Sequence, residues 1–305
     1  MSEIFEKVSC LQCGSIDFTS ITSVGQFGII TNVALCKECG FMFLSPRWTK
    51  ERYNDFYVKE YENYYPRQSN EKQQSGKLAE LIAERLYSFH DKGSYNKILD
   101  IGSGFGGVLM YLKEFHFQLA EYYAIEPSKI CIDHLKQNQI HIISETVDNN
   151  WHQANIKFDL IIIRHVLEHL LDPKLALNKV AEALTEDGIV YIAVPDAYHP
   201  VSPLNSYYFR VVHASYFNRD SIPFFLEAAG LEILELKDNL HGELYLIARK
   251  TNNRSRKPAL NIYAKQLGII ESTYTKEKEQ KKIPVSGKSL SYFFRKLINQ
   301  FIHIK

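Results

Sequence analysis

The sequence predicts an α/β fold built on a doubly wound, mostly parallel sheet, with a small cysteine-rich module at its N-terminal end. Between residues 97 and 249, apolar strand-like runs alternate with helix-like segments, which is the pattern of parallel βαβ units. Ahead of this region, four of the five cysteines form two C-x-x-C pairs. Paired cysteines of this kind indicate a bound metal in a reducing compartment rather than a disulfide framework.

Each predicted element can be located by its apolar pattern. The expected strands are KILDIG, EYYAIEPS, IHIIS, FDLIIIRHV and GIVYIAVP. The expected helices are FGGVLMYLKEF, KICIDHLKQN, PKLALNKVAEAL and RDSIPFFLEAAG. Two final runs, LEILELK and ELYLIARK, are separated by Gly242 and a few polar residues, so we expect an antiparallel hairpin at the edge of the sheet.

Composition and charge restrict the function classes. The chain has 305 residues, of which 45% are hydrophobic and 23% charged, as in an ordinary globular protein. No secretory pattern opens the sequence and no apolar run approaches the ~20 residues of a membrane span, so we expect a cytoplasmic protein. From Lys250 onward there are 13 basic and 3 acidic residues, whereas the rest of the chain has 23 and 32. We expect no nucleic-acid partner for such an acidic body.

The cysteine pairs predict a zinc site. Cys10, Cys13, Cys36 and Cys39 have the spacing of a zinc ribbon, and a glycine follows the second cysteine of each pair. The segment between the pairs alternates polar and apolar residues, as a hairpin does. Four protein ligands would close the site, so the predicted role of Zn²⁺ is structural. Cys131 has no partner in the sequence and is expected to be a small buried residue.

A glycine-rich turn follows the first predicted strand of the α/β region. It reads Asp100-Ile-Gly102-Ser103-Gly104-Phe105-Gly106. Glycines at such a turn let the backbone approach a ligand closely. Nicotinamide-binding proteins also have a glycine-rich turn, so an oxidoreductase is one alternative. The acidic residue inside the motif, the G-x-G-x-G spacing and the terminal hairpin argue against it.

This turn resembles motif I of class I S-adenosylmethionine (SAM) methyltransferases, which implies a Rossmann-like fold. The resemblance implies that Asp100 faces the methionine end of SAM while Gly102, Ser103 and Gly104 make room for it. Glu126, at the end of AIEPS, matches the residue that accepts hydrogen bonds from both ribose hydroxyls. Glu145 is a looser match to an adenine contact. His165, in FDLIIIRHVLEHLLDP, is expected beside the cofactor.

A wider resemblance, over roughly residues 8–249, is to methyltransferases of bacterial surface-polysaccharide gene clusters and to deoxysugar C-methyltransferases. It rests on the zinc module, the tyrosine-rich stretch that follows it, and HVLEHLLDP. It implies a sugar-nucleotide or glycan substrate. His213 matches the position of the general base and His241 lies in the matching final hairpin, with His169 as a further candidate. Val212 replaces the acidic neighbour of the base and the third domain is missing, so O-methylation is at least as well supported as C-methylation.

The expected organisation has four parts: a zinc ribbon (1–48), a tyrosine-rich helical connector (49–92), a SAM-binding domain (93–250), and a basic linker with an amphipathic helix (251–305). In the connector, the tyrosines either pack on the core, or Tyr61, Tyr64 or Tyr65 closes over the cofactor. The apolar face of the last helix lies within residues 290–304 and comprises Leu290, Phe293, Phe294, Leu297, Ile298 and Phe301. It either docks on this protein or a second copy, or binds the inner membrane face peripherally.

Several alternatives to these predictions remain open. His165-Val-Leu-Glu168-His169 also matches the H-x-x-E-H motif of some zinc proteases, which requires a helix that carries both histidines on one face. An RNA or protein methyltransferase could use the zinc ribbon to read its substrate, and a non-catalytic SAM-binding partner would show no turnover. For His213 as the base, we expect a pKa close to the reference value of ~6.5.

Overall fold

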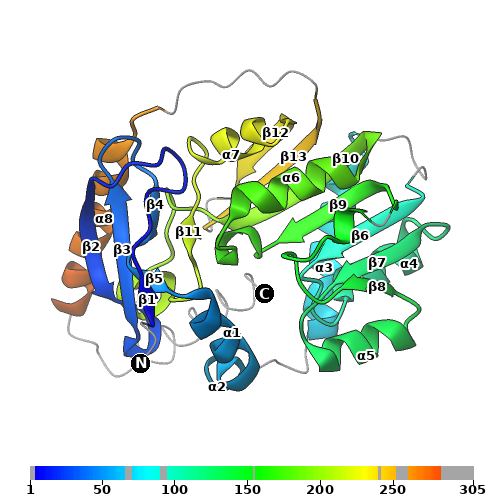
Figure 1. Ribbon diagram of the computed structural model, residues 1–305, viewed down its shortest axis with the longest axis horizontal. Coiled ribbons are helices and arrows are strands. Elements are labelled where there is room, and N and C mark those ends of the chain that lie inside the picture. Colours follow the sequence, from blue (N-terminus) through cyan, green and yellow to red (C-terminus); the bar gives the residue numbers. More distant parts are fainter. Residues whose placement is uncertain are drawn as a thin grey trace. The chain divides into compact units, whose positions relative to one another are not determined.

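The computed structural model describes residues 4–65, 71–89, 95–153, 155–239, 242–251 and 260–282, without the side chains of 71–75 and 281–282. The chain divides into two compact units. The first unit comprises Met1–Arg67 and Ile163–Glu277, and the second comprises Gln68–Ile162 and Lys278–Lys305. Figure 1 labels the elements of both units along the chain.

The second unit holds the first βαβ repeats. Its strands lie in the order β9-β6-β7-β8, and β6, β7 and β8 are parallel. The elements are α3 (Glu71–Leu86), β6 (Lys97–Ile101), α4 (Gly107–Phe115), β7 (Glu121–Ile125), α5 (Lys129–Gln137), β8 (His141–Ser144), a 3-10 helix (Trp151–Gln153) and β9 (Phe158–Arg164), which ends in the other unit. The interior residues of β6, β7 and β9 are buried, as expected for strands covered on both faces.

The first unit contains the end of the sheet. Its strands lie in the order β12-β13-β10, and β13 is antiparallel to both neighbours. The elements are a 3-10 helix (Leu167–His169), α6 (Pro173–Ala183), β10 (Leu184–Pro195), a π-helix (Leu204–Tyr208), α7 (Ile222–Ala228), β12 (Leu231–Asp238) and β13 (Glu243–Lys250). The predicted fold class is confirmed: an α/β fold with a mostly parallel central sheet and an antiparallel edge hairpin.

A second sheet in the first unit carries the cysteines. Its order is β11-β4-β3-β2, and it comprises β2 (Phe18–Val24), β3 (Ile30–Cys36), β4 (Met42–Leu44) and β11 (Ser215–Tyr216). A 3-10 helix (Gln26–Gly28) lies between β2 and β3, and β1 (Phe5–Glu6) pairs separately with β5 (Arg47–Trp48). The expected hairpin between the cysteine pairs is present, because β2 and β3 are antiparallel. The pairing of Ser215 with Phe43 and of Tyr216 with Met42 was not predicted.

The helix α8 (Tyr263–Lys282) packs on this second sheet (Figure 1). Ile270 is buried there with Val33, Leu35 and Met42 of the sheet. Tyr263, Leu267 and Tyr274 lie partly buried against the same cluster. The sequence analysis did not identify this helix in the basic segment. The predicted amphipathic face at residues 290–304 lies outside the described residues.

The tyrosine-rich connector begins with α1 (Lys50–Lys59) and α2 (Tyr61–Tyr64). The hydroxyl of Thr49 accepts a hydrogen bond from the Arg52 N–H, which caps α1. Phe56 and Tyr53 are buried in a cluster with Trp48, Val211 and Val212, on which Tyr61, Tyr64 and Tyr65 also pack. These contacts favour a packing role for the aromatic residues, whereas a cofactor contact stays a prediction. Of the helices in the described residues, none is both long and apolar enough to cross a membrane.

Two glycines, Gly14 and Gly40, allow a direct test of how α8 is held. Both have positive φ, 82° and 75°, and both follow a cysteine pair. A Cβ atom at Gly14 would meet nothing within 4 Å, whereas one at Gly40 would overlap the backbone of Ile262 and Tyr263. Each Gly→Ala change costs about 1–2 kcal/mol of backbone strain. We expect Gly40→Ala to lose about 1–3 kcal/mol more, because it also overpacks the start of α8.

Urea unfolding of both variants measures this difference. Gly14→Ala is the matched control, because both alanine variants have the same backbone strain from a positive φ, whereas only Gly40→Ala also overlaps the start of α8. An equal loss of unfolding free energy in the two variants would contradict the close contact between Gly40 and the start of α8.

Candidate functional site

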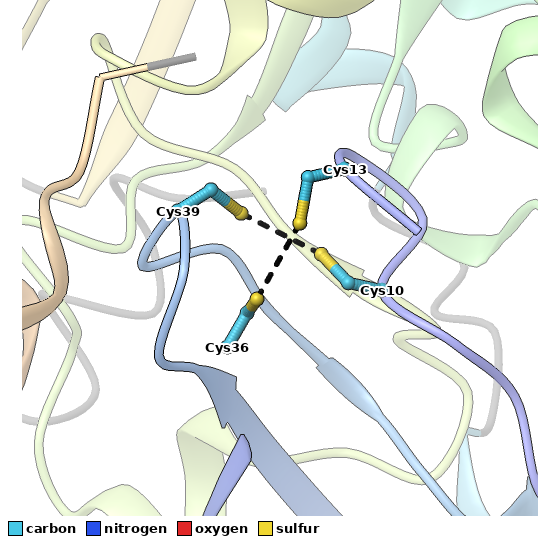
Figure 2. A group of neighbouring side chains, drawn as sticks. All are labelled: Cys10, Cys13, Cys36 and Cys39. Carbon is cyan, nitrogen blue, oxygen red and sulfur yellow. Dashed lines mark hydrogen bonds between the residues drawn. The ribbon is translucent and has the colours of Figure 1, made fainter. Parts of the chain in front are cut away.

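Four cysteine side chains converge in the first unit (Figure 2). The Sγ atoms of Cys10 and Cys39 lie 3.6 Å apart, as do those of Cys13 and Cys36. All four Sγ atoms lie within 4.8 Å of one another. Each pair closes a tight turn, in which the glycine N–H donates to the carbonyl of the first cysteine at 2.8 Å. The hydrogen bond from the Cys39 thiol lowers the pKa of Cys10 to about 5.

These residues fit a tetrahedral zinc ion. With Zn–S bonds of about 2.3 Å, tetrahedral geometry places the sulfur atoms about 3.8 Å apart. The observed separation of 3.6 Å for two pairs is close to that value. The fifth cysteine, Cys131, is buried in α5 of the other unit and has no place in the cluster.

The glycine-rich turn lies at the carboxyl end of β6, in the second unit. Glu126 follows β7, the neighbouring strand, and is only 4% exposed. Its carboxylate accepts hydrogen bonds from the backbone N–H groups of Gly104 and Ser128, each at 2.9 Å. Asp100 is buried near the end of β6. The structure therefore brings the predicted residues Asp100, Gly102, Ser103, Gly104 and Glu126 to one edge of the sheet.

The turn has the features of a ligand cradle. Gly104 has a φ of 57°, and the space that a Cβ atom would fill there is open. Ser103 Oγ is buried and has no hydrogen-bond partner among the described residues. By contrast, a Cβ atom at Gly106 would overlap Leu135 of α5, so that glycine serves packing. The residues present fit the adenosyl and methionine parts of SAM, whereas Glu145, just past β8, is exposed.

A cluster of histidines and carboxylates forms in the first unit. The rings of His169 and His213 are edge to face, with centroids 4.9 Å apart. Glu168 is 1% exposed, and its Oε1 lies 3.9 Å from His169 Nε2 and 3.5 Å from His165 Nδ1. His165 follows β9 with a φ of 53°, and its backbone N–H donates to the Ala193 carbonyl. The predicted catalytic residues His169 and His213 thus lie together.

Two further residues extend the histidine cluster. Glu243, at the start of β13, lies with its Oε2 3.1 Å from His165 Nε2. The hydroxyl of Tyr57 in α1 lies 3.3 Å from His169 Nδ1. Glu168, Glu243 and Tyr57 were not among the predicted site residues, although Glu168 stood in the H-x-x-E-H motif and Glu243 in the His241-Gly242-Glu243 segment of the final hairpin. His241 lies outside the described residues, so its proposed role stays a prediction.

Burial sets the protonation of the cluster. Burial and the nearby His169 hold the pKa of His213 well below its usual range, so the expectation of a value near the reference is wrong. Burial also lowers the pKa of His169, against the opposing effect of Glu168. Burial alone would raise the pKa of Glu168, but His165 and His169 lower it overall. His169 and His213 are therefore neutral at neutral pH. For His165, burial lowers the pKa, but the contacts with Glu168 and Glu243 raise it overall.

The protease alternative does not match this geometry. Leu167–His169 is a single 3-10 turn, and His165 precedes it in a left-handed conformation. The two histidines of the motif therefore do not lie on one helical face, as the zinc-protease motif requires.

Several solved structures of methyltransferases are similar to this chain at low sequence identity. A SAM-dependent methyltransferase from Clostridium acetobutylicum is 12% identical, with a TM-score of 0.45 over 66% of this chain and 99% of that one. An O-methyltransferase family protein from Burkholderia thailandensis is 12% identical, with a TM-score of 0.47 over 60% and 59% of the two chains. A SAM-dependent methyltransferase from Mesorhizobium loti is 17% identical, with a TM-score of 0.46 over 56% and 98%.

The comparison of sequences gives the family. No curated protein matches the chain significantly. The family model described as "Methyltransferase domain" matches residues 69–236, which is more than half of the chain. This match includes the glycine-rich turn, Glu126 and the H-x-x-E-H segment, so the predicted enzyme class is confirmed. The chain belongs to the methyltransferase-domain family.

Proposed function

We propose that this methyltransferase uses SAM to methylate a sugar or glycan intermediate, at oxygen or at carbon. The observation that carries the cofactor assignment is the buried Glu126 beside the open Gly104 turn. The substrate class is supported by the sequence resemblance to surface-polysaccharide and deoxysugar methyltransferases. The aromatic rings of Tyr57 and Tyr61, with centroids 5.2 Å apart, lie near the histidines. Such rings can pack against the apolar face of a sugar, while polar groups bind its hydroxyls.

The residues of the turn would bind SAM in defined ways. The carboxylate of Glu126 can accept hydrogen bonds from two vicinal ribose hydroxyls. Ser103 Oγ offers a hydrogen-bonding group with no other partner among the described residues. When bound, SAM supplies an electrophilic methyl group, and the protein contributes orientation and a proton acceptor.

The histidine cluster offers the proton acceptor. His213 is neutral at physiological pH because burial depresses its pKa. A neutral imidazole nitrogen can accept a proton from a hydroxyl or an acidic C–H group as the methyl group is transferred. We assign this role first to His213, with His169 and His241 as the next candidates.

We also propose that the cysteine cluster binds one structural Zn²⁺ ion. A closed site of four thiolates leaves no open position for a substrate. The ion would hold the loop before β2 against the turn after β3. The start of α8 packs on that second turn, since Ile262 N–H donates to the Cys39 carbonyl at 3.3 Å.

Removal of half of the ligands tests the zinc site. After the wild-type protein has passed over a chelating resin, elemental analysis should find about one zinc ion per chain. The double variant Cys36→Ser/Cys39→Ser should lose this ion. The double variant should also melt at a lower temperature, because metal binding contributes to folding. Cys131→Ser, which changes the one cysteine outside the cluster, is the matched control. Full zinc retention in the double variant would refute the site.

Replacement of Glu126 tests the cofactor site. Glu126→Ala removes the acceptor for two hydroxyls, so SAM affinity should fall about ten- to a hundredfold in a calorimetric titration. Glu121→Ala is the matched control, because it removes an exposed carboxylate at the other end of the same strand, and SAM affinity should not change. The assignment fails if the two variants bind SAM equally well.

Replacement of His213 tests the proton acceptor. With an acceptor found by screening sugar nucleotides, His213→Ala should lower kcat about 10²–10⁴-fold while SAM affinity stays within twofold. A base must be deprotonated to act, and the pKa of His213 is depressed. The wild-type rate should therefore stay level as the pH falls through ~6.5 and decline only below it. Wild-type turnover in His213→Ala would exclude this residue as the base.

A further inference from the structure

Glu168 carries a buried negative charge that the protein does not fully satisfy. The residue is 1% exposed, and neither of its carboxylate oxygens has a hydrogen-bond partner among the described residues. An ionised carboxylate in such a place costs several kcal/mol unless cations or hydrogen-bond donors compensate it. Its polar neighbours are imidazole nitrogens, His165 Nδ1 at 3.5 Å and His169 Nε2 at 3.9 Å from Oε1. Neither contact has the geometry of a hydrogen bond, so both carboxylate oxygens keep lone pairs that an ion could bind.

The side chains around Glu168 offer metal-ligand atoms. One carboxylate oxygen of Glu168 and one ring nitrogen each of His169 and His213 lie within 4.8 Å of one another. His213 Nδ1 is buried and has no hydrogen-bond partner in the described part of the chain. Ligands at about 2.1 Å from one metal are about 3.3 Å apart, so small side-chain rotations would complete the site.

The outer contacts of the histidines also match a metal site. A histidine that binds a metal through one nitrogen usually hydrogen-bonds through the other. His169 directs Nδ1 to the hydroxyl of Tyr57, which leaves Nε2 facing Glu168. The adjacent His165 is not a ligand of this site: its Nε2 contacts Glu243, and its Nδ1 lies 3.5 Å from Glu168 Oε1.

We propose that Glu168, His169 and His213 bind one divalent first-row transition-metal ion, such as Zn²⁺. Two imidazole nitrogens and a single carboxylate suit such an ion, whereas Mg²⁺ prefers oxygen ligands. Three protein ligands leave coordination positions open for water or a substrate oxygen. An ion there would lower the pKa of a bound hydroxyl group. This goes beyond the proposed function and changes the assignment of its base: with the ion bound, His213 and His169 give their lone pairs to the metal, so His241 would be the remaining candidate for the proton acceptor.

Metal stoichiometry tests the proposal without any methyl acceptor. After treatment with a chelator, the wild-type protein should retain one ion, the one at the cysteine cluster. In equilibrium dialysis against micromolar Zn²⁺, it should then bind one additional, exchangeable ion. Glu168→Gln, which keeps the side-chain size, and His213→Ala should each lose this additional ion or bind it at least tenfold more weakly. His199→Ala is the matched control. His199 also contacts a carboxylate, that of Asp196 at 2.7 Å, but it is not one of the proposed ligands, so the variant should bind the additional ion as the wild type does.

The two metal sites can be distinguished by their variants. Cys36→Ser/Cys39→Ser should lose the retained ion and keep the exchangeable one, whereas Glu168→Gln should show the reverse. Circular dichroism and urea unfolding verify that Glu168→Gln is folded. If wild-type protein binds no exchangeable ion, or if Glu168→Gln binds it with unchanged affinity, the proposal is overturned. The wild-type result stands even if the variants fail to fold, and none of these outcomes depends on SAM binding.

Discussion

The pairing of β11 with β4 is the constraint on which the histidine cluster depends. Tyr216 pairs with Met42, and the Leu44 N–H donates to the Ala214 carbonyl at 3.1 Å. His213 immediately precedes Ala214 in the chain, so these backbone bonds restrict its position. On its other side, the hydroxyl of Tyr53 donates to the Val211 carbonyl at 2.8 Å. The cysteine-bearing sheet and α1 therefore fix the loop that carries a candidate proton acceptor.

The same sheet explains why a cysteine cluster stands at the front of a methyltransferase. Gly40 closes the second cysteine turn, and the chain before α8 lies too close to it for any side chain. Further along, Ile270 of α8 is buried against Leu35 and Met42. The cysteine turns, the sheet and α8 thus form one packed layer within the first unit. Within this layer β4 pairs with β11, and His213 lies two residues before β11.

Sequence patterns predicted the parts of the fold whose contacting residues are close together in the sequence. Each βαβ repeat could be predicted because its apolar pattern is local. The candidate cofactor residues could be predicted because Asp100 to Gly104 form one continuous turn. The two-residue strand β11 pairs with a partner far away in the sequence, so it has no local signal. For α8, the apolar spacing of Tyr263, Leu267, Ile270 and Tyr274 could have revealed the helix. Neither the burial of Glu168 nor its nearness to His213 can be read from the motif that contains it.

A buried, ionised carboxylate without hydrogen bonds lowers the stability of a fold. Evolution can remove this cost by substitution with an apolar residue of similar size, and cores tolerate such replacements well. Glu168 instead lies between two histidines whose outer nitrogens are held by Tyr57 and Glu243. Functional sites are the typical places where a protein departs from such a rule, here the rule that buried charges are hydrogen-bonded. The contact with His165 offsets part of the cost of burying Glu168, and in the proposed site a bound ion would offset more of it.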